Sequence, residues 1–203
     1  MRTLSDELPQ IEVRLSSDYS PRLADALMKG RLDAAFMRPE PHAGSLVYKR
    51  LHAEPLIVVF SKGHRLAARK SIRLPEIKNE PFIKPATTAP TLRKIVEDSL
   101  KRAGLDTRAD HEAHNFAHTF SIISSARAVA LMPAYAKNYL PSFVTSRPIK
   151  GDVPTVDLVV GYNRANTSQI LKLFLERVEN LTSGKAVTDP RPSKALTQKV
   201  SYA

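Results

Sequence analysis

The sequence of 203 residues contains no cysteine and no tryptophan, and only 6% of its residues are aromatic. Without cysteine, the chain forms no disulfide and offers no thiolate to a metal ion or a substrate. It also lacks the run of about 18 apolar residues that a membrane-spanning helix requires. The N-terminal sequence MRTLSDELPQ has no apolar segment typical of a secretory signal. We therefore expect a cytoplasmic protein without a membrane partner.

The common signatures of catalysis are missing as well. The sequence has no GxSxG elbow, no glycine-rich phosphate loop and no cysteine nucleophile. His111, His114 and His118 have a spacing that would place them on one helix face, where they could bind a metal ion. However, HEAH differs from the HExxH zinc motif, and the surrounding residues predict a strand and a turn. We expect no metal, no cofactor and no catalytic residue.

Basic side chains outnumber acidic ones by 31 to 20, which gives a formal net charge of +11. Such an excess favours polyanions or acidic small molecules as partners. The clearest basic runs are Lys62, Arg65, Arg69, Lys70, Arg73 and Lys78, and later Lys185, Arg191, Lys194 and Lys199. Neither run alternates with aromatic residues, and neither has a helix-turn-helix pattern. We favour a solvated basic surface over direct nucleic-acid binding, which a salt-dependent gel shift would reveal.

Residues 9–38 contain the most informative local pattern. Alternating apolar residues predict a strand over 11–15. A short amphipathic helix follows, with Ser20 as its expected N-cap and Gly30 closing its C-terminus. Residues 33–37 then predict a buried strand. A compact β-α-β unit of this kind implies a parallel sheet with a ligand crevice at the carboxyl ends of its strands.

The rest of the chain continues as an α/β fold. Expected strands cover 46–48, 54–60, 82–83, 129–133, 144–149 and 155–162, with a strand and turn over 108–116. Expected helices cover 91–103, 117–127 and 168–181. This order predicts two lobes, the first formed by 1–61 with 152–182 and the second by 62–151. Residues 183–203 lack periodicity and are expected to be disordered.

Four segments resemble, in order, the effector-binding domain of LysR-type transcriptional regulators. They are ALMKGRLDAAFMR, EPLIVVFSKGHRLA, EPFIKPATTAPTLRKIVEDSLKRAGL and ISSARAVALMPAYA. The matching order covers nearly all of residues 8–181. The resemblance implies two Rossmann-like lobes, as in type 2 periplasmic binding proteins, with an inducer in the cleft. It also implies a cytoplasmic homo-oligomer that binds DNA through an N-terminal winged helix-turn-helix.

The sequence departs from this family pattern in several places. The DNA-binding module and its linker helix are absent, so only the sensing half is represented. The family also has one more β-α unit before Leu8, whose strand lies between those at Ile11 and Ala35. The fold is thus expected to lack its first β-α unit, and we predict aggregation unless a partner strand fills the gap. Ala126 and Ala128 replace glycines that are usual in the family, which affects how closely a ligand can approach that turn.

The resemblance places a set of polar and aromatic residues around the cleft. These candidate effector-binding residues are Ser20, Arg38, Lys84, Thr87, Thr88, Thr91, Asn115 and Phe116. Ser20 and the threonines precede helices, whose N-termini favour anions, and Arg38 could hold a carboxylate through two parallel bonds. Each residue also has a plainer interpretation: a helix cap, a surface ion pair, a solvated lysine or, for Phe116, a core position. The sequence leaves these alternatives open.

We therefore expect a non-enzymatic sensor of a small organic anion, with a carboxylate as the expected effector. A solute-binding protein of the same fold is the alternative, and a signal peptide or lipidation cysteine would favour it. An enzyme on this scaffold would need an acid/base set in the cleft that the sequence does not identify. Turnover of a bound ligand would distinguish that enzyme from a sensor.

Overall fold

The computed structural model describes residues 13–41, 43–106 and 110–182. The chain divides into two units, Met1–Thr167 and Ser168–Ala203. The described element of the second unit is α5 (Gln169–Thr182), which agrees with the helix predicted over 168–181. The predicted tail over 183–203 lies outside the described residues. The predicted division into two lobes stays a prediction.

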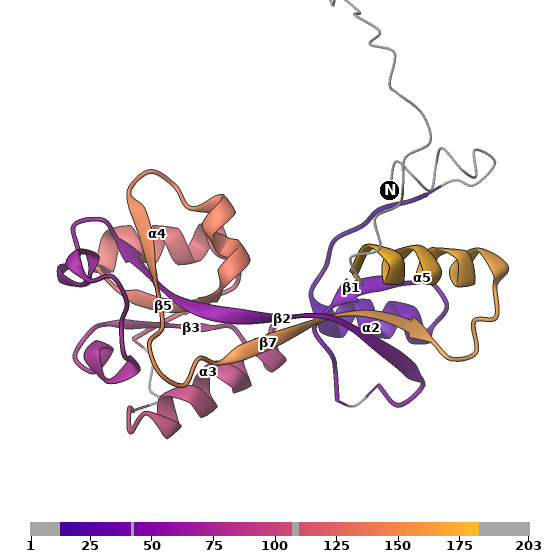
Figure 1. Ribbon diagram of the computed structural model, residues 1–203, viewed down its shortest axis with the longest axis horizontal. Helices are drawn as coiled ribbons and strands as arrows, with labels where there is room; N and C mark the ends of the chain where they lie inside the picture. The colour runs from indigo at the N-terminus through magenta and orange to yellow at the C-terminus, as the bar shows by residue number, and fades with distance from the viewer. Residues whose placement is uncertain (1–12, 42, 107–109, 183–203) are drawn as a thin grey trace, which may run out of the picture. The chain divides into compact units, whose positions relative to one another are not determined.

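The first unit contains a mixed sheet and three α-helices among its described residues (Figure 1). The strands are β1 (Ala35–Met37), β2 (Leu46–Ser61), β3 (Phe82–Pro85), β4 (His111–Ala113), β5 (Val129–Pro133), β6 (Val144–Pro148) and β7 (Thr155–Asn163). Their order is β1-β7-β2-β5-β3-β4, with β6 also paired to β2. The α-helices are α2 (Ser20–Met28), α3 (Pro90–Arg102) and α4 (Phe116–Ala126). Short 3₁₀ turns occur at Arg65–Ala68, Leu74–Ile77 and Ala134–Tyr139.

Strand β2 joins two groups of strands. The sequence predicted two separate strands here, but β2 is one continuous strand of 16 residues. Its first half pairs antiparallel with β7, and the two strands run side by side in Figure 1. Its second half pairs antiparallel with β5 and β6. The pairing with β7 shifts register between Arg50 and His52, so an irregularity interrupts the ladder without ending the strand.

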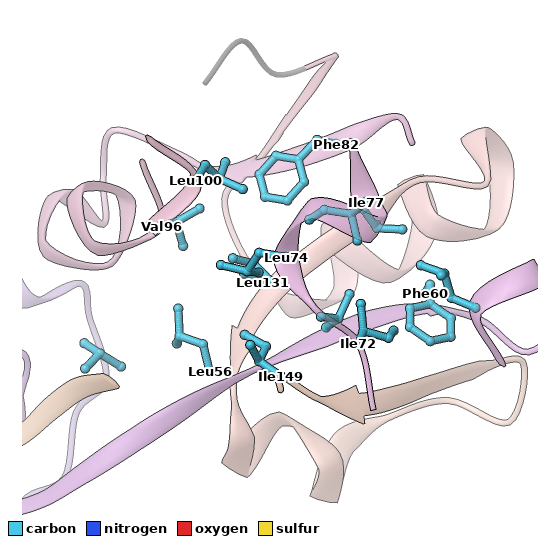
Figure 2. Close-up of a cluster of buried hydrophobic side chains, with 14 residues drawn as sticks. Leu56, Phe60, Ile72, Leu74, Ile77, Phe82, Val96, Leu100, Leu131 and Ile149 are labelled. Atoms are coloured by element: carbon cyan, nitrogen blue, oxygen red, sulfur yellow. The ribbon is translucent and has the colours of Figure 1, made fainter. Parts of the chain in front are cut away.

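The second half of β2 is buried on both faces, as its continuous apolar run predicted. Leu56, Val58 and Phe60 face one apolar cluster, whereas Ile57 and Val59 face another. Figure 2 shows the first cluster, in which Leu56 and Phe60 from β2 gather with apolar residues of α3, β3 and β5. The labelled partners include Phe82, Val96, Leu100 and Leu131. Packing on both faces holds β2 and its neighbouring strands in place, and the ends of these strands border the site described below.

The prediction for residues 9–38 is wrong in two respects. Residues 13–15 form no strand, and Leu15 is 77% exposed; Ile11 lies outside the described residues. Strand β1 pairs antiparallel with β7 instead of lying in a parallel β-α-β unit. An extended segment becomes a strand only when another strand accepts its backbone hydrogen bonds. Residues 13–15 belong to none of the described strands, so the alternating pattern produces no ladder there.

The helix ends follow the sequence closely. Gly30 after α2 has φ 65° and Gly104 after α3 has φ 69°, the left-handed backbone that glycine accommodates. The same conformation after α4 falls on Arg127, with φ 53°. Of the helices in the described part of the chain, none has the length and apolar character needed to cross a bilayer.

Candidate functional site

A cavity of about 830 Å³ lies where several element ends meet in the first unit. It is bordered by the starts of α2, α3 and α4 and by residues of β1, β3 and β5. Most of its lining is apolar, including Leu23, Ile83, Leu92 and Leu158. The volume suits a small organic molecule. Seven of the eight candidate residues line it: Ser20, Arg38, Lys84, Thr88, Thr91, Asn115 and Phe116.

Three helices begin at this cavity. The first turn of each helix contains backbone N–H groups that have no partner within the helix, and the helix dipole makes that end positive. None of the first turns of α2, α3 or α4 contains an acidic residue that would neutralise this potential. The convergence of three such ends therefore favours a negatively charged group in the cavity.

Ser20 lies at the start of α2, but the prediction that it caps this helix is wrong. The N-cap is Tyr19, which has extended backbone and makes no side-chain capping bond. Instead, the Ser20 hydroxyl oxygen accepts a hydrogen bond from the backbone N–H of Arg38, at 3.0 Å. Because the oxygen accepts this bond, the hydroxyl proton remains to be donated elsewhere. A carboxylate in the cavity is a suitable acceptor for it.

Arg38 follows β1 and is half-buried at the cavity. Its Nη1 donates to the carbonyl of Val156 at 3.4 Å, and its guanidinium carbon lies 5.8 Å from the centre of the Tyr135 ring. The surface ion pair considered from the sequence does not hold Arg38; a carbonyl and an aromatic face do. Because both partners are neutral, neither of them cancels the positive charge of the guanidinium.

Lys84 lines the cavity from β3, but the expectation that it is solvated is wrong. The residue is only 9% exposed, and its Nζ lies 3.1 Å from the Glu97 carboxylate. The Lys84 hydrogen bond is the main reason that the pKa of Glu97 lies below its ordinary value, with Arg93 contributing. Burying an ammonium group requires such a partner. Its charge is therefore already balanced within the protein.

The threonines before α3 differ in position. Thr88 lines the cavity, whereas Thr87 is exposed and borders a separate hollow of about 350 Å³ on α3. The interpretation of Thr91 as the helix cap is wrong, because the N-cap is Ala89. The Thr91 hydroxyl donates to the carbonyl of Pro39 at 2.9 Å. In this state Thr91 has lone pairs, but no proton, to offer a ligand.

Asn115 and Phe116 form the start of α4. The Asn115 side-chain oxygen accepts the backbone N–H of His118 at 2.9 Å and so caps the helix. Phe116 packs partly against the core, and its ring centre lies 5.5 Å from that of Tyr135. Asn115 therefore caps the helix and Phe116 packs against the core, and both residues also line the cavity.

Tyr19, Tyr135 and Glu54 also line the cavity, although they were not among the predicted residues. The Tyr19 hydroxyl donates to the backbone carbonyl of His114 at 3.2 Å, which links the starts of two helices. The Glu54 carboxylate accepts the backbone N–H of Tyr135 at 2.8 Å. The position of Tyr19 just before Ser20, and of Tyr135 just after a buried strand, was a signal available in the sequence.

The histidines do not share a helix face. His111 lies on β4, while the rings of His114 and His118 stack 6.1 Å apart. Within the described ranges, no three metal-binding side chains converge where an ion would fit. At the turn after α4, Ala128 is fully buried, and Arg127 holds the left-handed position.

Comparison with known proteins gives a consistent family match. A family model described as LysR substrate binding domain matches residues 1–182. The transcriptional regulator AlsR of Bacillus subtilis is 23% identical over 86% of this chain and 58% of its own length. The Hca operon activator HcaR of Escherichia coli is 26% identical over 86% of this chain and 61% of its own length. The chain thus spans about three fifths of these curated relatives.

Solved structures show the same fold. The BenM effector binding domain with its effector benzoate has a TM-score of 0.78 at 17% identity, covering 93% of this chain and 86% of that domain. The effector binding domain of QuiR in complex with shikimate has a TM-score of 0.77 at 14% identity, covering 90% of each chain. The prediction of an α/β fold of the periplasmic-binding-protein type is confirmed.

Proposed function

Because the chain belongs to the LysR substrate-binding domain family, whose curated relatives are transcriptional regulators, we propose that it binds a small organic anion in the cavity and couples this binding to transcription control. The observation that carries the proposal is the position of Arg38 beside three helix starts on one cavity. A carboxylate there would meet the guanidinium, the Ser20 hydroxyl and the positive ends of the helices.

Three other charged groups on the cavity have charged or polar partners, and the Glu40 carboxylate lines the cavity as well. Lys84 pairs with Glu97, and the Glu54 carboxylate accepts a backbone N–H and lies 3.5 Å from His52. Asp18 lies 3.7 Å from the Arg22 guanidinium. Among the ion pairs of the described residues, Arg38 has no acidic partner. Its positive charge is therefore available to a ligand in the cavity. At the side of the cavity formed by Arg38 and the helix starts, an anion is therefore favoured over a cation.

Two hydrogen bonds suggest how binding is coupled to conformation. The Tyr19 hydroxyl bonds the His114 carbonyl, and the Thr91 hydroxyl bonds the Pro39 carbonyl. Both bonds join elements that border the cavity, so an effector that contacts the same elements changes their relative stability. If the protein has two conformations, the effector can shift the equilibrium between them by no more than the difference in its binding free energy for the two. The same proposal includes a cytoplasmic homo-oligomer that contacts DNA through a helix-turn-helix module outside these residues.

Isothermal titration calorimetry with carboxylates and matched amides tests this proposal. The panel is benzoate, shikimate and hexanoate, with benzamide and hexanamide as uncharged counterparts. We expect at least one acid to bind and its amide not to. Arg38→Ala should weaken that acid roughly ten- to hundredfold, since it removes a hydrogen bond between charged groups. Arg31→Ala, just after α2, is the matched control and should leave the affinity unchanged, because neither Arg31 nor its partner Asp25 lines the cavity.

Two results would contradict the proposal. One is equal binding of an acid and its amide, because the negative charge would then contribute nothing. The other is an unchanged affinity in Arg38→Ala, because the charge would then be recognised elsewhere.

A further inference from the structure

We propose that the effector is an aromatic carboxylate whose ring lies against Phe116 and Tyr135 while its carboxylate meets Arg38. This inference rests on the proposed function and narrows the class of ligand. It is based on an aromatic wall at one side of the cavity, formed by Phe116 and Tyr135.

The wall consists of two rings from different elements. Phe116 begins α4, and Tyr135 belongs to the 3₁₀ turn after β5. Their ring centres are 5.5 Å apart and their planes are tilted by 37°. Aromatic pairs attract in stacked and edge-on arrangements with centres about 4.5–7 Å apart. A planar ligand ring that stacks on one of these rings can therefore meet the other in a tilted contact.

Phe116 is held in place by packing, and the backbone of Tyr135 by a hydrogen bond. Phe116 packs against the core cluster and lies 6.1 Å from the ring centre of Phe120. The backbone N–H of Tyr135 is fixed by the Glu54 carboxylate of β2. Tyr139 completes the cluster, 6.2 Å from Phe116, but does not line the cavity. The Phe116 face of the wall is thus in place before a ligand arrives, which lowers the entropic cost of binding.

The cation is placed next to the wall. The Arg38 guanidinium lies 5.8 Å from the Tyr135 ring centre, a distance at which cation and ring attract. This contact orients the guanidinium beside the aromatic surface while its charge stays available. A benzoate-like molecule matches the arrangement, because its flat ring and its carboxylate are joined within one small rigid body. An aliphatic acid would satisfy Arg38 but make no ring contact.

A matched pair of acids separates the aromatic contribution from charge and size. Benzoate and cyclohexanecarboxylate have the same charge and a six-membered ring, and only benzoate is aromatic. By isothermal titration calorimetry, we expect benzoate to bind about three- to tenfold more tightly, the range of an aromatic pair. Equal affinities would overturn the inference.

Variants locate the preference on the wall. Tyr135→Leu and Phe116→Leu keep an apolar side chain but remove the aromatic face, so each should bring the ratio of the two affinities towards one. Phe143→Leu, an exposed aromatic residue outside the cavity lining, is the control and should preserve the ratio. The inference would also be overturned if the affinity ratio were unchanged in both wall variants, or if the variants weakened the binding of both acids by the same factor. Circular dichroism establishes that each variant is folded.

The outcomes separate the two proposals. If cyclohexanecarboxylate binds as tightly as benzoate and both depend on Arg38, the anion sensor stands and the aromatic preference falls. If no acid of either panel binds, the proposed function itself fails.

Discussion

Lys84 lies on β3 with its ammonium group 3.1 Å from the Glu97 carboxylate. Glu97→Gln keeps the size of the side chain but removes its charge, so the buried ammonium loses its counter-charge. We expect the free energy of unfolding at pH 7 to fall by about 1–3 kcal/mol, as measured by urea denaturation. Asp98→Asn, which affects an exposed pair with Lys94, is the control and should change stability little.

The effect of Glu97→Gln should also depend on pH, because the Lys84 hydrogen bond lowers the pKa of Glu97 in the folded protein. A carboxyl with a lowered pKa stabilises the fold above its unfolded pKa of about 4.3 and loses that contribution as the pH falls through the folded value. The stability difference between wild type and variant should be complete at pH 7 and shrink below about pH 4.3. A difference that persists unchanged in acid would contradict this explanation.

Arg127 holds a left-handed backbone, with φ 53°, directly after α4. A side chain at such a position destabilises the folded state by about 1–2 kcal/mol relative to glycine. Replacing it with glycine removes this cost, but the greater freedom of glycine in the unfolded chain offsets part of the gain in stability. We expect Arg127→Gly to raise the free energy of unfolding by about 0.5–1 kcal/mol. Ala126→Gly, at the last helical residue, should lower it by a similar amount. Stabilisation by both changes would contradict this account.

At the scale of secondary-structure elements, Asn115 combines a helix cap with a position on the cavity. Asn115→Ala removes the cap of α4 and should cost about 1 kcal/mol of stability in urea denaturation. Asn115→Asp keeps the cap and adds a charge that the helix dipole favours, so stability should be retained. The same change puts a negative charge beside the proposed anion site and should weaken carboxylate binding in calorimetry. Unchanged carboxylate affinity in Asn115→Asp would place the ligand away from α4.

The elements that the sequence predicted well are those whose causes are local. Apolar periodicity and the glycines after α2 and α3 located the helices within one or two residues. The continuous apolar runs of β2 and β5 located strands that are buried on both faces. Residues 13–15 failed because forming a strand depends on a partner elsewhere in the chain.

The site was predictable by position but not by bonding. Seven candidate residues line the cavity because they stand at the ends of helices and strands, which the sequence pattern indicated. Their partners come from distant segments: Ser20 bonds Arg38, Thr91 bonds Pro39 and Lys84 pairs with Glu97. Periodicity carries no information on such contacts. Tyr135 was missed for the same reason, since its ring faces Arg38 from far along the chain.

At the scale of the whole molecule, the order of described strands ends at β1, a strand of three residues paired with β7. Exposed sheet ends promote pairing between chains. The expectation that this chain aggregates unless another strand completes the sheet stays a prediction. Light scattering coupled to size-exclusion chromatography tests it at low and high protein concentration. A monomer at both concentrations that also unfolds cooperatively would contradict it.

The central claim is that one cavity binds an acid through Arg38 and its ring through the aromatic wall. A crystal structure of the protein saturated with benzoate tests it most directly. We predict electron density for the carboxylate within hydrogen-bonding distance of the Arg38 guanidinium and the Ser20 hydroxyl, with the ring against Phe116 and Tyr135. Benzoate bound outside this cavity, or inside it with the carboxylate directed away from Arg38, would contradict the account.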